Sequence, residues 1–169
     1  PARFIHKSFA TPYNNIGIIC GPCHAEEVAL ERLSYLTIAC ENNLIAKEMS
    51  ELLNCRYIKT TLSDDLFGTE FSAILKNVYA LCSGISAGLG YGDNFQSVLI
   101  SSCVREMKKF VHKIYKTNRD INDSEYLGDL LVTCYSSFSR NRTLGNMIGK
   151  GYTLKAAISE MSMISEGYY

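Results

Sequence analysis

A change in hydrophobic period near residue 64 restricts the possible folds of this chain more than any other feature of its sequence. Before that point, short β-branched runs alternate with amphipathic stretches, which predicts the order strand, helix, strand, helix, strand over residues 16–20, 24–32, 35–40, 43–53 and 57–62. Such alternation favours parallel strands joined by crossover helices. We therefore expect residues 1–64 to be the C-terminal part of an α/β domain.

After residue 64 the apolar residues recur at helical spacing. In the segment 71–89 they form one stripe, and small residues surround Lys76 on the opposite face. This pattern predicts a helix that is buried on both sides and carries a buried lysine. A second long helix is expected over 95–115, with Arg105, Lys108, Lys109 and Lys113 outside, and further helices over 125–134, over 141–149 and after Thr153. Residues 65–169 are thus expected to be all-α, which makes the whole chain predominantly helical.

Composition and charge exclude several classes of protein. The 169 residues include 17 Lys and Arg and 17 Asp and Glu, so the formal net charge is 17 − 17 = 0, which offers no electrostatic footprint for nucleic acid or an anionic membrane. No apolar run approaches the roughly 18 residues that a membrane span requires. Seven irregularly spaced cysteines favour a reducing compartment, so we expect a cytoplasmic protein. The chain begins at Pro1 and its first methionine is Met49, which indicates a piece of a longer protein.

The motif Cys20-Gly21-Pro22-Cys23 follows a predicted strand and opens a predicted helix. Three interpretations are open: a thioredoxin-like dithiol, a tight turn with the cysteines as small apolar fillers, or a ligand site at the carboxyl edge of a sheet, where helix N–H groups face an anion. The only prolines are Pro1, Pro12 and Pro22, so no later proline can form the loop that a thioredoxin places opposite its dithiol.

Polar residues in the predicted helical region suggest a second site. The run 139–142 opens a helix, which predicts either a solvated basic turn or an oxyanion clamp made of Arg140 and helix N–H groups. Asp129 has apolar neighbours, which is costly unless it is paired, and Lys76 and Arg140 are its candidate partners. These three residues would make an acid/base site for an anionic substrate. The glycine-rich runs 88–93 and 145–151 match nucleotide loops poorly, and the three scattered histidines suggest no metal site.

Six short motifs occur in the order found in one enzyme family: Gly21-Pro22-x-x-Ala25-x-Glu27, Leu75-Lys76-Asn77-Val78-Tyr79-Ala80, Gly88-Leu89-Gly90-x-Gly92-Asp93-Asn94, Gly128-Asp129-Leu130-x-x-Thr133-Cys134, Ser139-Arg140-Asn141-Arg142 and Glu166-Gly167-Tyr168. From about Ile16 onward the chain resembles the bacterial-type NAD(P)-dependent glycerol-3-phosphate dehydrogenases. The resemblance implies that residues 1–64 are the C-terminal part of an NAD(P)-binding Rossmann domain. It also implies that residues 65–169 are a helical substrate-binding and catalytic domain that lacks its last helices.

The resemblance also implies a reaction and a set of site residues. The reaction is reversible hydride transfer between NADH or NADPH and dihydroxyacetone phosphate, giving sn-glycerol 3-phosphate for glycerophospholipid synthesis. Lys76 and Asp129 match catalytic positions, with Asn77 and Thr133 as supporting polar groups. The substrate contacts implied are Gly21, Cys23, Lys76, Asp129, Ser139, Arg140 and Asn141. The cofactor contacts implied are Ala25, Arg140, Ile164 and Glu166.

Two further points follow from the resemblance. The family usually has Ser or Thr where Cys23 stands, and a thiol is a weaker hydrogen-bond donor than a hydroxyl. Family members often dimerise through the helical domain, which implies a homodimer. Two alternatives from other classes are a helical interaction module without catalysis and a dithiol oxidoreductase that uses Cys20 and Cys23.

Overall fold

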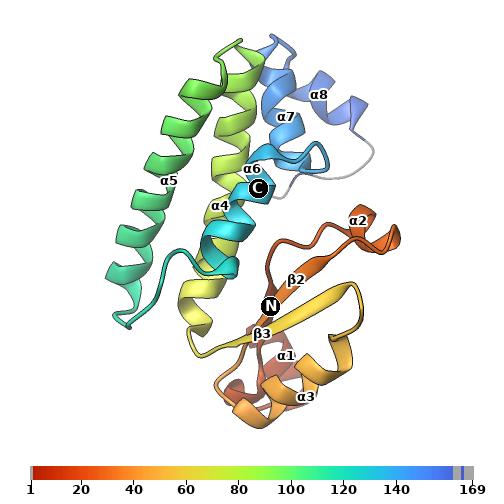
Figure 1. Ribbon diagram of the computed structural model, residues 1–169, viewed down its shortest axis with the longest axis vertical. Coiled ribbons are helices and arrows are strands. Elements are labelled where there is room, and N and C mark those ends of the chain that lie inside the picture. The colour runs from red at the N-terminus through yellow and green to blue at the C-terminus, as the bar shows by residue number, and fades with distance from the viewer. Residues whose placement is uncertain (1, 162–164, 166–169) are drawn as a thin grey trace.

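A small sheet lies at one end of a group of helices (Figure 1). The structure is a computed structural model, and it describes residues 2–161 and 165. The strands are β1 (Ile18–Cys20), β2 (Ser34–Ala39) and β3 (Ile58–Ser63). The helices around the sheet are α1 (Ala2–Phe9), the 3-10 turn η1 (Tyr13–Asn15), α2 (Ala25–Ala29) and α3 (Asn43–Leu53). The other helices are α4 (Leu66–Gly88), α5 (Asp93–Ile114), the π-helix η2 (Ser124–Gly128), α6 (Asp129–Tyr135), α7 (Arg140–Gly149) and α8 (Leu154–Glu160).

The sheet has the order β1-β2-β3, and its pairing corrects one prediction. β2 and β3 are parallel, as expected, but β1 pairs with β2 antiparallel. The reason lies in the connection between them, because α2 has only five residues and rises about 7.5 Å, whereas the six-residue β2 extends about 20 Å. So short a helix cannot carry the chain back along the sheet. Instead the chain turns at Glu31, whose φ is +55°, and enters β2 in the opposite direction.

Side-chain caps explain where several helices begin. α3 has the predicted bounds, and the Asn42 side chain accepts a hydrogen bond from Leu44 N at 3.1 Å. α8 begins after Thr153, as predicted, and the hydroxyl of Thr153 accepts from Ala156 N. α4 begins at Leu66 rather than at residue 71, because the Asp65 carboxylate accepts from Gly68 N at 3.0 Å and starts the helix earlier. α1 and η1 are not predicted by the periodicity at all.

The orientation of α4 differs from the prediction. None of its predicted stripe residues is fully buried, and Ile74 and Val78 are 56% and 43% exposed, whereas most of the small polar face is buried. Ser83 shows why, since its hydroxyl donates to the Gln96 side chain and to the Cys134 backbone carbonyl. Small side chains let neighbouring helices approach closely and hydrogen-bond across the contact. The expectation that both faces of this helix are buried is therefore wrong.

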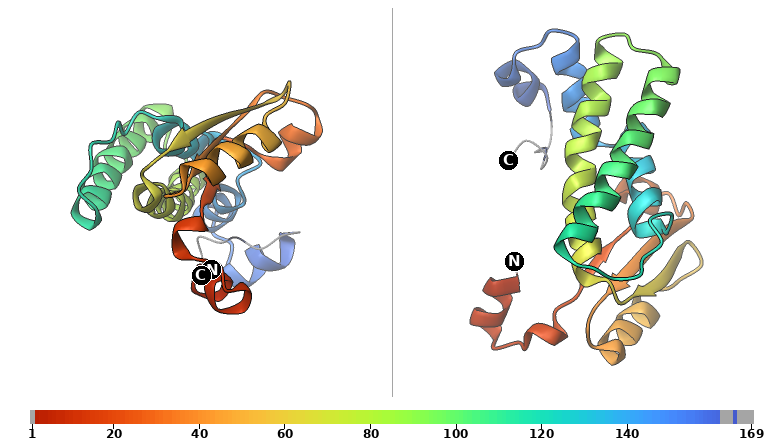
Figure 2. Two further views of the ribbon diagram at one scale, coloured as in Figure 1. Left: turned by 90° about the horizontal axis from the view of Figure 1, so that it is seen from below. Right: turned by 90° about the vertical axis from the view of Figure 1, so that its left-hand side faces the viewer.

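Helix α7 packs along that small face through four glycines. A Cβ on Gly145 would lie 2.1 Å from the Leu81 carbonyl oxygen, and a Cβ on Gly84 would lie 2.1 Å from the Arg142 carbonyl oxygen. Gly88 and Gly149 make the same kind of contact one turn further along. The other long neighbour, α5, runs beside α4 (Figure 2).

The buried apolar residues form two clusters. The larger joins α4, α5, η2 and α6, and its members are Tyr79, Ala80, Ile100, Cys103, Met107, Ile121, Tyr126, Leu130 and Cys134. The smaller joins β2 to α3 through Ile38, Cys40 and Ala46. Within the described part of the chain, no helix combines the length and apolar character that a bilayer crossing requires.

Candidate active site

A lysine and an aspartate from different helices form the centre of the candidate site. Lys76 lies in the middle of α4, and its Nζ donates to Oδ2 of Asp129 at 2.5 Å. The Lys76 side chain is 20% exposed and the Asp129 side chain 3%. The pairing predicted for Asp129 is thus present, and the ammonium group retains some access to solvent.

Asp129 is positioned by the π-helix that precedes it. η2 ends at Gly128 and α6 begins at Asp129, so the carboxylate lies at the junction of two helix types. π-Helical turns are rare and are frequently found at functional sites. The Thr133 hydroxyl donates to the Asp129 backbone carbonyl at 2.6 Å, which keeps Thr133 beside the ion pair.

The turn after β1 packs against this junction. A Cβ on Gly128 would be 3.6 Å from the Pro22 ring, so the turn 20–23 lies against the end of η2, next to Asp129. Gly21 has a φ of +129°, and a side chain there would approach the Tyr35 carbonyl oxygen to 2.6 Å. Only glycine fits this turn without strain. Pro22 of this turn thus lies against Gly128, the residue before Asp129, while Gly21 packs against β2 at Tyr35.

The thiols of this turn do not have the character of a reactive dithiol. Burial raises the pKa of Cys20 to about 12, with Asp129 and Glu125 adding to the effect and Lys76 opposing it. The pKa of Cys23 is also raised, first by burial and then by Asp129 and Glu27, against a hydrogen bond with Ser34. A dithiol oxidoreductase needs a stabilised thiolate. These two cysteines therefore give the oxidoreductase alternative no support.

The start of α7 is tied to the residue that follows Lys76. Asn141, which is 3% exposed, donates from Nδ2 to Oδ1 of Asn77 at 3.0 Å. The Ser165 hydroxyl donates to Oδ1 of the same Asn141. Ser139 caps the helix, and its Oγ accepts from Arg142 N at 3.3 Å. Ser139 and Asn141 are thus held by buried polar contacts close to the Lys76 turn of α4.

Arg140 lines a cavity of about 310 Å³ beside the same helix start. Glu26 and Phe138 line it too, and Ala25 precedes Glu26 at the beginning of α2. Ala25 is itself exposed, as are most residues of that short helix. The two other predicted cofactor contacts, Ile164 and Glu166, lie outside the described residues.

Two groups near the site were not singled out from the sequence. His24 has a buried Nε2 that finds no hydrogen-bond partner among residues 2–161 and 165, and its ring lies 6.1 Å from that of Phe138. Glu125 is 7% exposed and accepts from the Thr37 hydroxyl at 3.3 Å, which joins β2 to the π-helix. Glu125 precedes Asp129 by one helical turn, and this spacing is the only feature of the sequence that indicates a position near the site.

The arrangement supplies two chemical functions. A lysine ammonium held by a buried carboxylate can give a proton to a developing alkoxide. A helix start with an adjacent Arg and Asn can bind an oxyanion through backbone N–H groups and charged donors. The Asn141–Asn77 hydrogen bond brings the two functions close together, so the geometry suits a small anionic substrate.

Comparison with known proteins agrees with this geometry. Residues 65–169 match the family described as NAD-dependent glycerol-3-phosphate dehydrogenase C-terminus. The chain is 36% identical over 169 residues to glycerol-3-phosphate dehydrogenase (NAD(P)+) of Staphylococcus aureus strain JH9, covering 99% of this chain and 51% of that protein. The chain thus spans about half the length of the curated relatives it matches.

Solved structures show the same relationship. The crystal structure of glycerol-3-phosphate dehydrogenase from Coxiella burnetii matches with a TM-score of 0.89 and 31% identity, covering 99% of this chain and 52% of that one. DsGPDH of Dunaliella salina matches with a TM-score of 0.87 and 25% identity, covering 98% of this chain and 29% of that one. The chain therefore belongs to the NAD-dependent glycerol-3-phosphate dehydrogenase family.

Proposed function

We propose that the protein containing this chain catalyses reversible hydride transfer between NADH or NADPH and dihydroxyacetone phosphate, which gives sn-glycerol 3-phosphate. The observation that carries the proposal is the contact of Lys76 with Asp129 beside the polar start of α7. The names of the relatives support the same reaction, since they are glycerol-3-phosphate dehydrogenases. The product is a precursor of glycerophospholipids.

Lys76 is the proposed proton donor. When hydride reaches C2 of the ketone, negative charge develops on the C2 oxygen, and a nearby ammonium group neutralises it by giving up a proton. Asp129 orients Lys76, because its carboxylate is buried and fixed at the start of α6. Asn77 and Thr133 support the pair from α4 and α6.

The substrate phosphate is assigned to the start of α7. Arg140 offers a planar fork of donors, and Asn141 and Ser139 add polar groups at the positive end of a ten-residue helix. Asn141 is bonded to Asn77, the residue after Lys76, so the phosphate end and the proton donor are held at a constant separation. Gly21 and Cys23, in the turn that contacts Gly128 through Pro22, are the further substrate contacts proposed.

The cofactor, NAD or NADP, supplies the hydride when it is bound. The orphan Nε2 of His24 fits such a group, because a nicotinamide carboxamide presents both a donor and an acceptor. The residues proposed to hold the cofactor are Ala25, Arg140, Ile164 and Glu166, of which Arg140 lines the cavity beside α2. Of these, the structure describes Ala25, at the start of α2, and Arg140, at the start of α7.

The proposal extends to the organisation of the whole protein. Residues 1–64 are proposed as the C-terminal part of the NAD(P)-binding Rossmann domain and residues 65–169 as the helical substrate domain. Residues 1–169 alone are therefore expected to be inactive, because the rest of the Rossmann domain is needed to bind the cofactor. The location proposed for the whole enzyme is the cytoplasm. A homodimer through the helical domain is supported by apolar side chains exposed on α4, including Phe67, Ile74 and Val78.

The test is an assay of the full-length protein with dihydroxyacetone phosphate and either NADH or NADPH. The decrease in absorbance of the reduced cofactor measures the reaction. We expect turnover with at least one cofactor and formation of glycerol 3-phosphate in equal amount. A correctly folded protein that turns over neither cofactor would instead support a helical interaction module without catalysis.

A further inference from the structure

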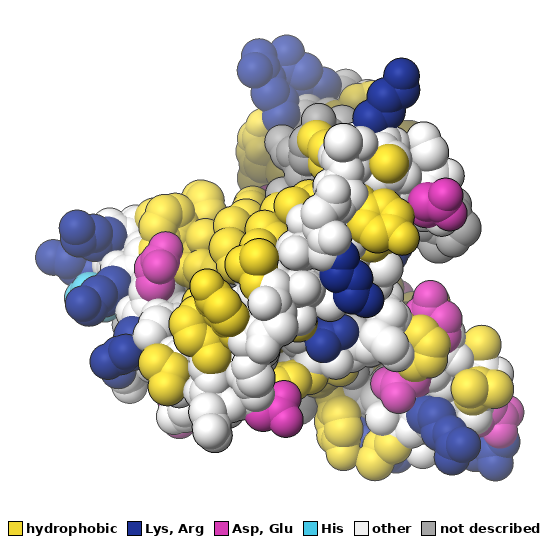
Figure 3. Space-filling view, turned by 90° about the horizontal axis from the view of Figure 1, so that it is seen from above, with side chains coloured by type: hydrophobic (Ala, Val, Ile, Leu, Met, Phe, Trp, Pro, Cys, Tyr) yellow, Lys and Arg dark blue, Asp and Glu magenta, His cyan; other side chains and the backbone are white. Residues whose placement is uncertain are grey.

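The second half of α5 and the loop after it concentrate positive charge that the neutral total of the chain conceals. Residues 105–119 contain one acidic residue, Glu106, and six of the 17 Lys and Arg residues. The net charge of this segment is therefore 6 − 1 = +5 in a chain of net charge zero. Basic side chains gather at the edge of the molecule on the side of α5, with a histidine among them (Figure 3).

Four of these six basic residues line a cavity of about 570 Å³. Its wall on α5 consists of Arg105, Lys108, Lys109 and His112, which follow the i, i+3, i+4, i+7 spacing of a single helix face. Thr117, Asn118 and Arg119 of the following loop complete the lining, and none of the described residues that line it carries a carboxylate. The volume lies within the range of small-molecule sites.

The nearby acidic groups leave most of this charge unneutralised. Glu106 lies toward α4, since the pKa of the Tyr79 hydroxyl is raised first by burial and then by the Glu106 carboxylate. Asp65 pairs with Arg119 from outside the cavity lining. Among the residues that the structure describes, Arg105, Lys108 and Lys109 have no ion-pair partner.

Arg119, although paired with Asp65, has one donor nitrogen without a hydrogen-bond partner among the described residues. Its side chain is 6% exposed, its Nε is bonded to Asp65, and its Nη2 donates to the Tyr115 carbonyl oxygen at 3.0 Å. Its Nη1 is buried and has no hydrogen-bond acceptor in the part of the chain that the structure describes. A buried charged donor without an acceptor is costly, and an oxyanion in the cavity that Arg119 lines would provide one.

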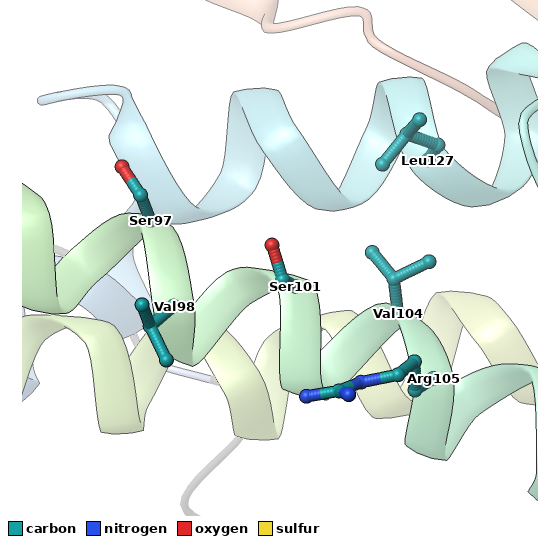
Figure 4. A pocket seen from close by; sticks show the side chains of 6 residues that line it. All are labelled: Ser97, Val98, Ser101, Val104, Arg105 and Leu127. Carbon is teal, nitrogen blue, oxygen red and sulfur yellow. The ribbon is translucent and has the colours of Figure 1, made fainter.

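The adjoining groove on α5 has a different character. It lies between α5 and η2, and among its described lining residues Arg105 alone is charged, beside Ser97, Val98, Ser101, Val104 and Leu127 (Figure 4). The charged lining residues are therefore concentrated at the cavity near the end of α5, and only Lys113 and Lys116 of the counted basic residues lie outside it. This concentration favours a compact ligand over an extended polyanion.

We propose that the cavity between the end of α5 and the loop 117–119 binds a small polyvalent oxyanion of the phosphate or polyphosphate class. This cavity is separate from the proposed substrate site, because none of the residues that line the cavity belongs to the start of α7. Thr117 and Asn118 would add neutral hydrogen bonds to the charged ones from the lysines and arginines.

The test is calorimetric titration of the full-length protein with inorganic pyrophosphate at low ionic strength. We expect saturable binding, and the double variant Lys108→Gln/Lys109→Gln should raise Kd at least about 10-fold by removing two charged donors. The matched control is Lys113→Gln/Lys116→Gln, which removes the same charge from exposed positions outside the cavity and should change Kd by less than about 2-fold. Arg140→Gln, at the proposed substrate site, should leave this binding in place.

Three results would overturn the proposal. The first is the absence of saturable pyrophosphate binding, including the case in which only a long polyanion such as heparin binds. The second is an equal loss of affinity in the control variant, which would indicate charge without a site. The third is loss of all binding in Arg140→Gln, which would assign the anion to the substrate site. Thermal unfolding of each variant establishes that it is folded.

Discussion

Nζ of Lys76 lies 2.5 Å from Oδ2 of Asp129, although 53 positions separate the two residues in the chain. The contact depends on α4 and α6 packing against each other and on the π-helix that ends just before Asp129. It holds the proposed proton donor in one position, and four predictions follow from this site and from its supports.

Replacement of Lys76 should abolish most of the proposed activity. Lys76→Met retains the length and apolar stem of the side chain but has no proton to give, so we expect kcat of the full-length protein to fall at least about 10²-fold. Steady-state turnover of dihydroxyacetone phosphate measures this. Lys113→Met is the control, since Lys113 is exposed near the end of α5. Equal turnover in the two variants would remove Lys76 from its proposed role.

The buried carboxylate of Asp65, just before α4, should make the free energy of unfolding depend on pH in the acid range. Burial by itself would raise the pKa of Asp65, but hydrogen bonds from Arg119, from the Tyr126 hydroxyl and from Gly68 N outweigh it and hold the pKa below its ordinary value of 3.8. A carboxyl whose pKa is lowered on folding stabilises the protein fully above its unfolded pKa. That stabilisation is lost as the pH falls through the lower, folded pKa.

We therefore expect Asp65→Asn to lower the free energy of unfolding by about 3 kcal/mol at neutral pH, because Arg119 then loses a buried partner. The difference from the unsubstituted protein should shrink as the pH falls below about 4. Urea unfolding of the full-length protein at several pH values measures both effects. The control is Asp64→Asn, since Asp64 is the exposed neighbour of Asp65. An equally large loss of unfolding free energy in that variant would contradict the prediction.

The glycine contact between α4 and α7 should be intolerant of a methyl group. In Gly145→Ala the new Cβ would lie 2.1 Å from the Leu81 carbonyl oxygen, and backbone atoms cannot move aside as a flexible side chain can. The helices must separate, which we expect to cost at least about 2 kcal/mol. Separation would also draw Asn141 away from Asn77, so KM for the substrate should rise.

Gly92→Ala is the comparison for that variant. A Cβ on Gly92 would have no described atom within 4 Å beyond its chain neighbours, and the φ of Gly92 is −76°, so the change should cost less than about 1 kcal/mol. Thermal and urea unfolding of both proteins decide the matter. Similar stability in the two variants would show that α7 does not depend on the close approach.

The cysteines of the turn after β1 should react slowly with alkylating reagents. Burial raises the pKa of Cys20 to about 12, so at pH 8 it is a thiol and a poor nucleophile. Iodoacetamide should therefore modify the exposed Cys55 and Cys82 well before Cys20, as measured by peptide mass spectrometry over time. Faster labelling of Cys20 would restore the dithiol interpretation.

Much of the secondary structure follows from local sequence. The bounds of α3 and the start of α8 were predicted because Asn42 and Thr153 are caps that act on the next turn of chain. β2 and β3 were predicted within a residue or so for a similar reason, since β-branched runs have few other stable conformations. The link between Lys76 and Asp129 was also expected, because a carboxylate among apolar neighbours needs a cation.

The direction of β1 and the buried face of α4 were predicted wrongly, and both depend on distant parts of the chain. The antiparallel pairing follows from the shortness of α2 and the turn at Glu31. The apolar residues of α4 identify it as a helix, but the glycines of α7 select its small face for burial.

The sequence by itself determined the order of the elements, most of their boundaries and the residue types available for a proton donor and an anion clamp. Local caps, β-branched runs and helical spacing act over a few residues, so they can be seen in one dimension. Only the tertiary structure decided which face of α4 is buried, that Asn141 meets Asn77, and that five basic or titratable side chains from 105 to 119 surround one cavity. Those outcomes depend on the distance between elements, which close backbone packing sets and which no local pattern encodes.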